Sequence, residues 1–280
     1  MKEQPHQFTE LVIESGKTEK NYWQDLWRYR ELFYILSWRD IKVRYKQTLI
    51  GALWSIIRPL LTMIIFTIVF SKIARIPSGL KAPYAIMVYA GMLPWIFFST
   101  SLAEASISLI GNANLITKVY FPRLIIPTAT VITSFVDFII SFVLMLGLYV
   151  WFNYYPDWHI IMLPVFLLFG FVASMGAGLY LTALNVKYRD FRYIVPFIVQ
   201  FGLYISPVGF NSNIIPEKWR LLYAINPVVG VIDGFRWSLL RGEQELRWDT
   251  LAVSFTSAIF FMWLGVRQFR KMEKSFADLI

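Results

Sequence analysis

Long apolar segments, separated by polar connections, fill most of the chain between residues 49 and 266. A helix rises about 1.5 Å per residue and a bilayer core is about 30 Å thick, so roughly 20 apolar residues suffice to cross it. Because backbone groups in lipid must be hydrogen-bonded within their own segment, the pattern predicts an all-α integral membrane protein with six transmembrane helices. We expect these helices at about 49–70, 84–103, 124–152, 160–184, 194–210 and 249–266.

The basic residues of the connections indicate which way the helices run. If the N-terminus lies in the cytoplasm, the inner segments carry more than twice as many Lys and Arg as the outer segments. Positive residues are retained on the cytoplasmic side of membranes. We therefore predict a multi-pass protein with both ends in the cytoplasm, an N-terminal tail at 1–21 and a C-terminal tail at 267–280.

The segment 22–48 has the pattern of an amphipathic helix. At helical spacing one face collects aromatic and apolar residues, and a neighbouring face is basic. The first face holds Trp23, Trp27, Tyr34, Trp38, Ile41 and Tyr45, and the second holds Arg28, Arg39, Lys42 and Lys46. Such a helix typically lies along the lipid headgroups. The alternative is a helix that packs on a partner protein, and both interpretations can hold together.

The segment 211–248 is too polar to cross the membrane, yet it contains two apolar runs, 221–225 and 228–232, on either side of Asn226-Pro227. Proline interrupts a helix because it lacks a backbone donor. We therefore predict a re-entrant hairpin of two short helices between the fifth and sixth spans. Its backbone can enter the membrane only where protein or a water-filled cavity covers it. A plain extracellular cap is the alternative.

The composition agrees with a membrane protein and limits the kinds of functional site that the chain can form. Hydrophobic residues make up 57% of the chain, charged residues 16%, and the mean hydropathy is +0.52, which argues against a soluble enzyme. Cysteine is absent and there are two histidines, so we expect no metal site. The net charge of +9 follows the inner membrane face, and nucleic acid is not needed to explain it.

Two local features bear on catalysis and ion coupling. Ser15-Gly16-Lys17-Thr18 resembles the end of a phosphate-binding loop, but the glycine that the motif needs five residues earlier is Leu11. Asp137 is the one clearly intramembrane acid, and Glu104 ends the second span. Ion-coupled transporters typically use several such groups, so a buried hydrogen-bond partner is favoured over a coupling site. We find no constellation for catalysis and predict that the chain is not an enzyme.

Aromatic side chains recur in three of the predicted spans. They are candidates for the lining of a conduit, because ring faces give apolar contact of low specificity to a moving chain. The alternatives are lipid contact, interfacial belts and ordinary core packing. The candidate lining residues are Trp54, Phe66 and Phe70 in the first span, Trp95, Phe97 and Phe98 in the second, and Phe197, Phe201 and Tyr204 in the fifth.

Several motifs then occur in a familiar order. The first is Arg39-Asp40-Ile41-Lys42-Val43-Arg44-Tyr45-Lys46-Gln47-Thr48-Leu49-Ile50-Gly51, followed by Leu53-Trp54 and Arg58-Pro59-Leu60. Asn185-Val186-Lys187-Tyr188-Arg189-Asp190, Ser206-Pro207-Val208, Asn226-Pro227 and Phe235-Arg236 follow. From about Arg30 onward, the chain resembles ABC-2 type permeases that export polysaccharides, such as the O-antigen and teichoic-acid exporters. The opening motif is the specific part of this resemblance.

The resemblance implies a homodimer of six-helix subunits, an ABC-2 transmembrane domain at 49–266, joined to two copies of a separate ATPase. ATP and magnesium would bind to that partner, and this chain would bind no cofactor. A coupling helix is implied at about 112–120, and the segment before the first span would also contact the ATPase. The implied coupling residues are Arg39, Lys42, Arg44, Asn112, Asn114, Leu115, Ile116 and Lys118. An ordinary inner loop is the alternative for 112–120.

The resemblance also implies that the hairpin at 211–248 is an outer gate, with Trp219, Asn226, Pro227, Asp233 and Arg236 as its candidate residues. The expected function is the export of a lipid-linked, O-antigen-like polysaccharide across the bacterial inner membrane. Export of teichoic acid, a drug or a lipid is the alternative within the family. An ion-coupled secondary transporter is the alternative from another class, and Asp137 would then be essential.

Overall fold

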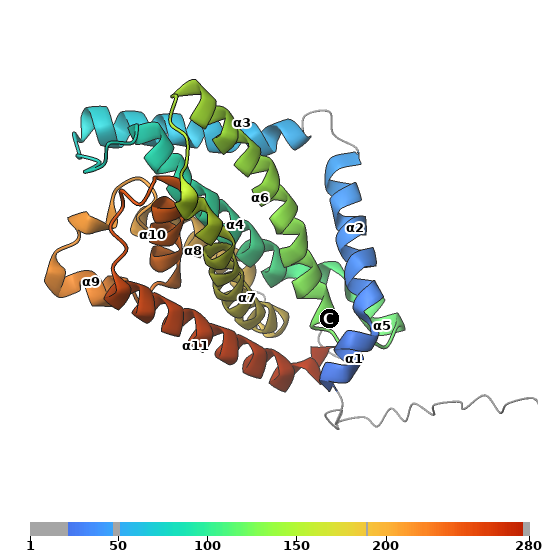
Figure 1. Ribbon diagram of the computed structural model, residues 1–280. Helices are drawn as coiled ribbons and strands as arrows, with labels where there is room; N and C mark the ends of the chain where they lie inside the picture. The colour runs from blue at the N-terminus through green and yellow to red at the C-terminus, as the bar shows by residue number, and fades with distance from the viewer. Residues whose placement is uncertain (1–21, 47–50, 189, 277–280) are drawn as a thin grey trace, which may run out of the picture.

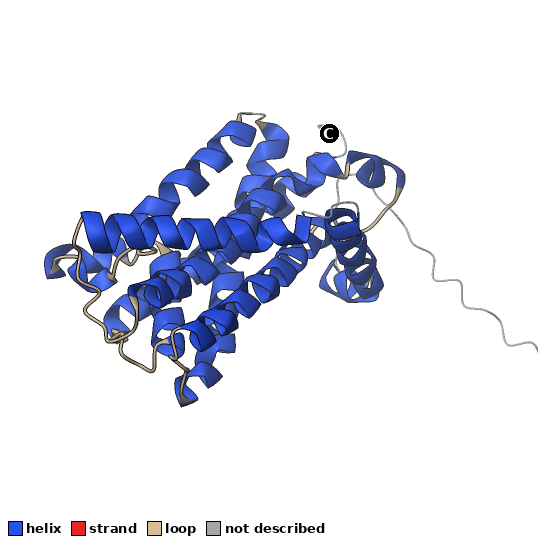
Figure 2. Cartoon of the chain, turned by 90° about the horizontal axis from the view of Figure 1, so that it is seen from above, coloured by secondary structure: helices blue, strands red, loops and turns tan. Residues whose placement is uncertain are grey.

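The computed structural model describes residues 22–46, 51–188 and 190–276, and these residues form only helices and loops (Figure 2). The predicted N-terminal tail and the first two residues of the first predicted span lie outside them. The helices are α1 (Tyr22–Arg28), α2 (Arg30–Lys46), α3 (Gly51–Phe66), α4 (Tyr84–Gly111), α5 (Ala113–Lys118), α6 (Ile125–Trp151), α7 (Leu163–Lys187), α8 (Phe191–Ile205), α9 (Glu217–Tyr223), α10 (Pro227–Leu239) and α11 (Trp248–Glu273). Short π and 3₁₀ segments are η1 (Thr67–Ile73), η2 (Trp158–Met162) and η3 (Ser212–Ile214).

Five helical segments are long and apolar enough to cross a membrane, and they confirm a multi-pass membrane fold. They are Leu53–Ile73, Tyr84–Gly111, Ile125–Trp151, Trp158–Lys187 and Trp248–Glu273. The fifth predicted span corresponds to α8, which has 15 residues. At about 1.5 Å per residue α8 extends about 22 Å, so it is shorter than the hydrocarbon core of a bilayer.

The last helix is longer than its hydropathy indicates. α11 continues for seven residues beyond the predicted end of the sixth span, to Glu273. Hydropathy reports where a helix leaves the lipid, whereas the helix itself ends where its backbone hydrogen bonds end. Half of the predicted C-terminal tail is therefore helix.

The amphipathic helix lies across one end of the bundle. Figure 1 shows α2 turned away from the direction of α3 and α11, with α1, α5 and the end of α11 gathered near it. The predicted single helix is divided at Tyr29, where Leu32 donates its backbone N–H to the Tyr29 carbonyl over 2.9 Å. Trp23, Trp27 and Trp38 remain exposed. This placement is the one expected for a helix at the membrane surface.

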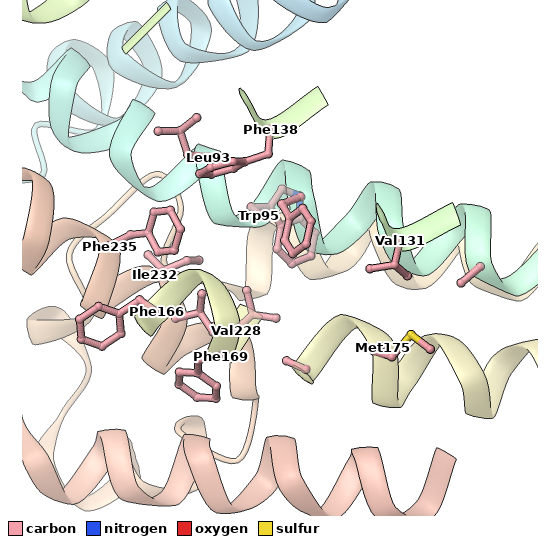
Figure 3. Packing of buried hydrophobic residues seen from close by; sticks show 14 of the residues in the cluster. Leu93, Trp95, Val131, Phe138, Phe166, Phe169, Met175, Val228, Ile232 and Phe235 are labelled. Atoms are coloured by element: carbon pink, nitrogen blue, oxygen red, sulfur yellow. The ribbon is translucent and has the colours of Figure 1, made fainter. Parts of the chain in front are cut away.

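α4 and α7 form the centre of the bundle, and α10 packs against both of them (Figures 1 and 3). Phe138 of α6 meets Phe235 of α10 edge to face, with ring centroids 5.9 Å apart. α7 and α11 approach so closely that a side chain at Gly265 would lie 2.1 Å from the Gly176 carbonyl oxygen. Small residues allow helix backbones to approach in this way in membranes.

The hairpin breaks at the predicted proline. α9 ends at Tyr223 and α10 begins at Pro227, and the Asn226 side-chain oxygen accepts the Val228 N–H over 3.1 Å as an N-cap. α10 is buried along most of its length, whereas α9 has no buried residue. Within the hairpin, α10 therefore packs in the interior, whereas α9 lies on the surface. Both lie at the end of the bundle opposite α1 and α5 (Figure 1).

Candidate functional site

A groove opens on the side of the bundle where α3, α4 and α8 meet. Its cavity volume is about 450 Å³. Its apolar wall comes from Trp54 of α3, Trp95 of α4 and Leu203 of α8, and its base reaches α2 and α6. The polar and charged residues of the lining are Arg44, Ser55, Arg58, Thr62, Ser99, Thr100, Glu104, Asp137 and Ser141.

The base of the groove is a cluster of three charged side chains. The Arg44 guanidinium of α2 donates one hydrogen bond to Glu104 of α4 and another to Asp137 of α6. Asp137 also accepts the Tyr45 hydroxyl. Burial, and then the hydrogen bond to Asp137, raise the pKa of Tyr45 to about 12, so the phenol stays protonated and donates. One cation thus serves two acids, as expected for charges at membrane depth.

This cluster joins the surface helix to the membrane bundle. The side chain of Arg44, which the family resemblance implies to be a coupling residue, points into the bundle. Asp137 has two partners on α2, as the buried hydrogen-bond interpretation expects. The sequence signal for this cluster was the presence of charged residues within or at the edge of apolar segments. Asp137 lies inside the third span and Glu104 ends the second, and each needs a partner of opposite sign.

Two tryptophans on facing helices form the groove's aromatic wall, and they differ in exposure. Trp54 is 47% exposed and has the Arg58 guanidinium 5.5 Å from its ring centroid. Trp95 is 6% exposed, and its ring occupies the space that a side chain at Gly202 of α8 would need. Trp54 is therefore available to a ligand, whereas Trp95 mainly holds α4 against α8.

The remaining aromatic candidates divide in the same way. On α8, Phe197, Phe201 and Tyr204 are all about half-exposed or more, and Phe197 and Phe201 lie 4.2 Å apart between ring centroids. Phe66 is buried, and its ring lies 5.4 Å from Phe70 and 6.2 Å from Tyr204. The exposed rings of α8 and of Trp54 on α3 are together called the aromatic surface, and Phe66 lies against Tyr204 between the two helices.

At the end of the bundle near α2, several of the predicted coupling residues come together. Arg39 of α2 donates to the Asn112 side-chain oxygen over 2.8 Å, and Asn112 donates to the Ser108 carbonyl over 2.9 Å. Lys42 lies over the ring of Trp38. Asn114 and Lys118 of α5 are exposed. Ile116 is buried, and Leu115 packs against the core, so these two anchor α5 instead of facing outward.

At the opposite end, the predicted gate residues separate into two groups. Trp219 on α9 is 53% exposed. Arg236 on α10 is fully buried and donates to the backbone carbonyls of Met87, Val208 and Phe210 over 3.2, 2.8 and 2.8 Å. Asp233 accepts the Ser212 hydroxyl, and Asn226 and Pro227 form the N-cap and first residue of α10. Arg236 therefore fixes α10 to α4 and to the loop after α8.

The chemistry of the groove is that of binding. Within residues 22–46, 51–188 and 190–276, no three His, Cys, Asp or Glu side chains gather in a way that could hold a metal ion. Aromatic faces stack on apolar ring surfaces, and Ser99, Thr100 and Thr62 offer hydroxyls that donate and accept. The groove is open along one side, so it can contact a long flexible molecule that slides past it.

Comparison with known proteins agrees with this geometry. Residues 31–240 match the model of the ABC-2 type transporter family. The chain is similar to an O-antigen export system permease protein from Myxococcus xanthus, 29% identical over 261 residues that span 92% of this chain and 98% of the relative. A Klebsiella pneumoniae permease of the same description is 27% identical over 89% of this chain and 95% of its own length. A polysialic acid transport protein from Escherichia coli is 23% identical over 83% and 91%.

Proposed function

The chain belongs to the ABC-2 type transporter family, and from this premise we propose that it is the permease subunit of an ATP-driven exporter of a lipid-linked polysaccharide. The observation that carries the proposal is the aromatic surface of α3 and α8 beside an open, hydroxyl-bearing groove. Relatives described as O-antigen export permeases match nearly the whole chain and support the same substrate class. The membrane would be the bacterial inner membrane, with both termini in the cytoplasm.

The exposed aromatic surface suits a polysaccharide for a physical reason. Stacking on the C–H faces of sugar rings is favourable for every residue of the polymer, and it does not depend on a particular hydroxyl pattern. A polymer can therefore advance from Trp54 toward Phe201 and Tyr204 without falling into one deep minimum. The groove hydroxyls can exchange hydrogen bonds with sugar hydroxyls along the same path.

A second copy of the chain would complete the conduit. α8 is too short to cross the hydrocarbon core alone, and lipid cannot hydrogen-bond the backbone groups at its ends. In the single chain little of α3 is buried and most of α8 is exposed. A homodimer that apposes these helices would cover the short helix and enclose the aromatic surface between two subunits.

The driving force would come from a separate ATPase that binds ATP and magnesium. Its docking surface would include Arg39 of α2 and the exposed Asn114 and Lys118 of α5, which lie at the same end of the bundle. Motion of α2 would reach α4 and α6 through the Arg44 cluster, because that cluster ties the three helices together. Such transmission requires two arrangements of the bundle that the nucleotide biases differently.

The proposal is tested by deleting the gene and complementing it with variants. We expect loss of the surface polysaccharide on deletion and its return with the wild-type chain. Asn114→Glu with Lys118→Glu should prevent co-purification of the ATPase and abolish export, while the variant remains folded in the membrane. Lys72→Glu with Lys218→Gln, at exposed positions away from α5, is the charge-matched control. Unchanged polysaccharide with a loss of drug efflux on deletion would reject the proposed substrate.

A further inference from the structure

A second groove lies between α1 and the C-terminal half of α11, away from the conduit surface. Its cavity volume is about 930 Å³. Toward the middle of α11 the lining is apolar, with Ile259, Met262 and Val266. Toward the end of the helix it is basic, with Arg267, Arg270 and Lys271. The groove therefore combines a long apolar wall with a cationic end.

Aromatic rings hold the two arginines in place. The Arg270 guanidinium lies 4.2 Å from the ring centroid of Tyr22 and 6.0 Å from that of Trp23, both on α1. Arg267 lies 5.1 Å from the ring centroid of Trp263, one turn earlier on α11. Such cation–π contacts fix the direction of a guanidinium and leave its N–H groups free to donate.

The two exposed cations of the groove, Arg267 and Lys271, form no ion pair within the described residues. Arg270 differs from them, because Glu273 interacts with it electrostatically; Glu273 also accepts the Tyr22 hydroxyl over 3.1 Å and the Arg123 backbone N–H over 2.9 Å. An anionic ligand in the groove would therefore be favourable beside Arg267 and Lys271, which are exposed and line it.

The depth of the cationic end matches the phosphate level of a bilayer. Residues 250–266 of α11 carry no charge. At about 1.5 Å per residue they extend about 26 Å, close to the thickness of the hydrocarbon core. Arg267 and Lys271 then lie at the headgroups, and the apolar wall runs along the acyl chains. The same depth follows whichever side of the membrane the end of α11 occupies.

We infer that this groove binds one anionic phospholipid, whose phosphate contacts Arg267, Arg270 and Lys271 and whose acyl chains lie along Ile259, Met262 and Val266. An anionic phospholipid fits because one end of the groove is basic, its wall is apolar, and the two follow each other along the membrane normal. The lipid would bridge α1 to α11 and so help to hold the surface helix on the bundle. The inference does not depend on the exported substrate.

The test measures lipid retention by native mass spectrometry of the full chain, exchanged into phosphatidylglycerol or phosphatidylcholine with identical acyl chains. We expect the wild type to retain one phosphatidylglycerol in strong preference to phosphatidylcholine. Arg267→Gln with Lys271→Gln removes two exposed cations and should lower that retention about tenfold or more. Lys72→Gln with Lys218→Gln removes the same charge at exposed positions outside the groove and should leave retention unchanged.

A second arm separates a lipid site from a site for any anion. Phosphatidylglycerol should raise the thermal stability of the wild type more than that of the Arg267→Gln, Lys271→Gln variant. Inorganic phosphate at the same concentration should have no such effect. Equal retention of the two lipids, equal losses in both double variants, or an equal stabilisation by inorganic phosphate would each overturn the inference.

Discussion

α4, and α3 continued by η1, are both apolar helical segments of membrane-spanning length, yet they differ strongly in burial. The most apolar stretch of α3 is the more hydropathic of the two, but 17% of it is buried against 78% for α4. Water drives apolar residues inward in soluble proteins, whereas in a bilayer the lipid is as apolar as leucine and that driving force is absent. Hydropathy therefore selects helices for the membrane and does not select them for the core.

Burial of α4 follows instead from small and polar residues. Thr182 of α7 donates to the Ala105 carbonyl over 2.7 Å, and Asn185 donates to the Ser106 carbonyl over 2.8 Å. On the other side, Tyr89 of α4 donates to the Ser141 carbonyl of α6 over 2.8 Å. α3 carries mostly leucine and isoleucine on its exposed face. α4 thus holds the bundle together, whereas little of α3 is buried and most of α8 is exposed in the single chain.

The largest expected effect of this difference is at Arg236, which fixes α10 to α4. Arg236→Ala removes the donor to three backbone carbonyls and leaves the nearby, half-buried Asp233 without this cation. We expect a loss of about 3–5 kcal/mol in the free energy of unfolding, because breaking a buried charge network is strongly destabilising. Thermal unfolding in detergent measures it.

Arg58→Ala is the matched control for Arg236→Ala, because Arg58 is an exposed arginine on α3. We expect it to change stability by less than about 1 kcal/mol. An equal loss of stability in both variants would contradict the assignment of α4 and α10 to the core and of α3 to the exposed surface.

The next largest effect compares two residues of the same type, the two tryptophans of the groove. Trp95→Ala on α4 should cost about 3 kcal/mol of stability, because it empties a packed site against α8. Trp54→Ala on α3 should cost less than about 1 kcal/mol and should reduce export, since its ring is half-exposed. Stability is measured by thermal unfolding and export by surface polysaccharide. If Trp54→Ala unfolds the protein as readily as Trp95→Ala, Trp54 is a core residue.

Much of the fold follows from the sequence because it depends on local properties. Burial does not follow, because it depends on the neighbouring helices. The apolar runs locate the start of each span to within a few residues, and Asn226-Pro227 locates the break in the hairpin, because apolar composition and backbone chemistry are local properties. The roles of Phe66 and Phe201 cannot be separated in this way. Both are phenylalanines in apolar helices, and their exposure depends on which neighbouring helix covers them.

The charged cluster shows another limit of the sequence. The pattern of 22–48 assigns Arg44 to the surface helix correctly, but the direction of its side chain depends on Glu104 and Asp137, which are distant in sequence. Arg39 and Arg44 lie five residues apart, which turns them to different faces of the helix. A search for opposite charges at the same membrane depth could have paired Arg44 with the two acids.

A smaller effect is expected from a single interhelical hydrogen bond of α4. Thr182→Val keeps the shape of the side chain and removes the donor to the Ala105 carbonyl. We expect a loss of about 0.6 kcal/mol, the average for such bonds in membranes, and at most about 1.7 kcal/mol. Thr62→Val on α3, whose hydroxyl bonds only within its own helix, is the control and should be nearly neutral. Thermal unfolding of the two variants compares them.

The smallest effect on stability, and the sharpest on transport, is expected at Phe201. Its ring is about half-exposed on α8, so Phe201→Ala should change the free energy of unfolding by less than about 1 kcal/mol. The same change removes a stacking face from the aromatic surface and should slow export, whereas Phe201→Tyr retains the face and should restore it. Phe66→Ala, at a buried ring, should lower stability and export together. Equal ratios of export to folded protein in Phe201→Ala and Phe66→Ala would mean that α8 contributes packing alone, and the division between a structural α4 and a transporting α8 would be wrong.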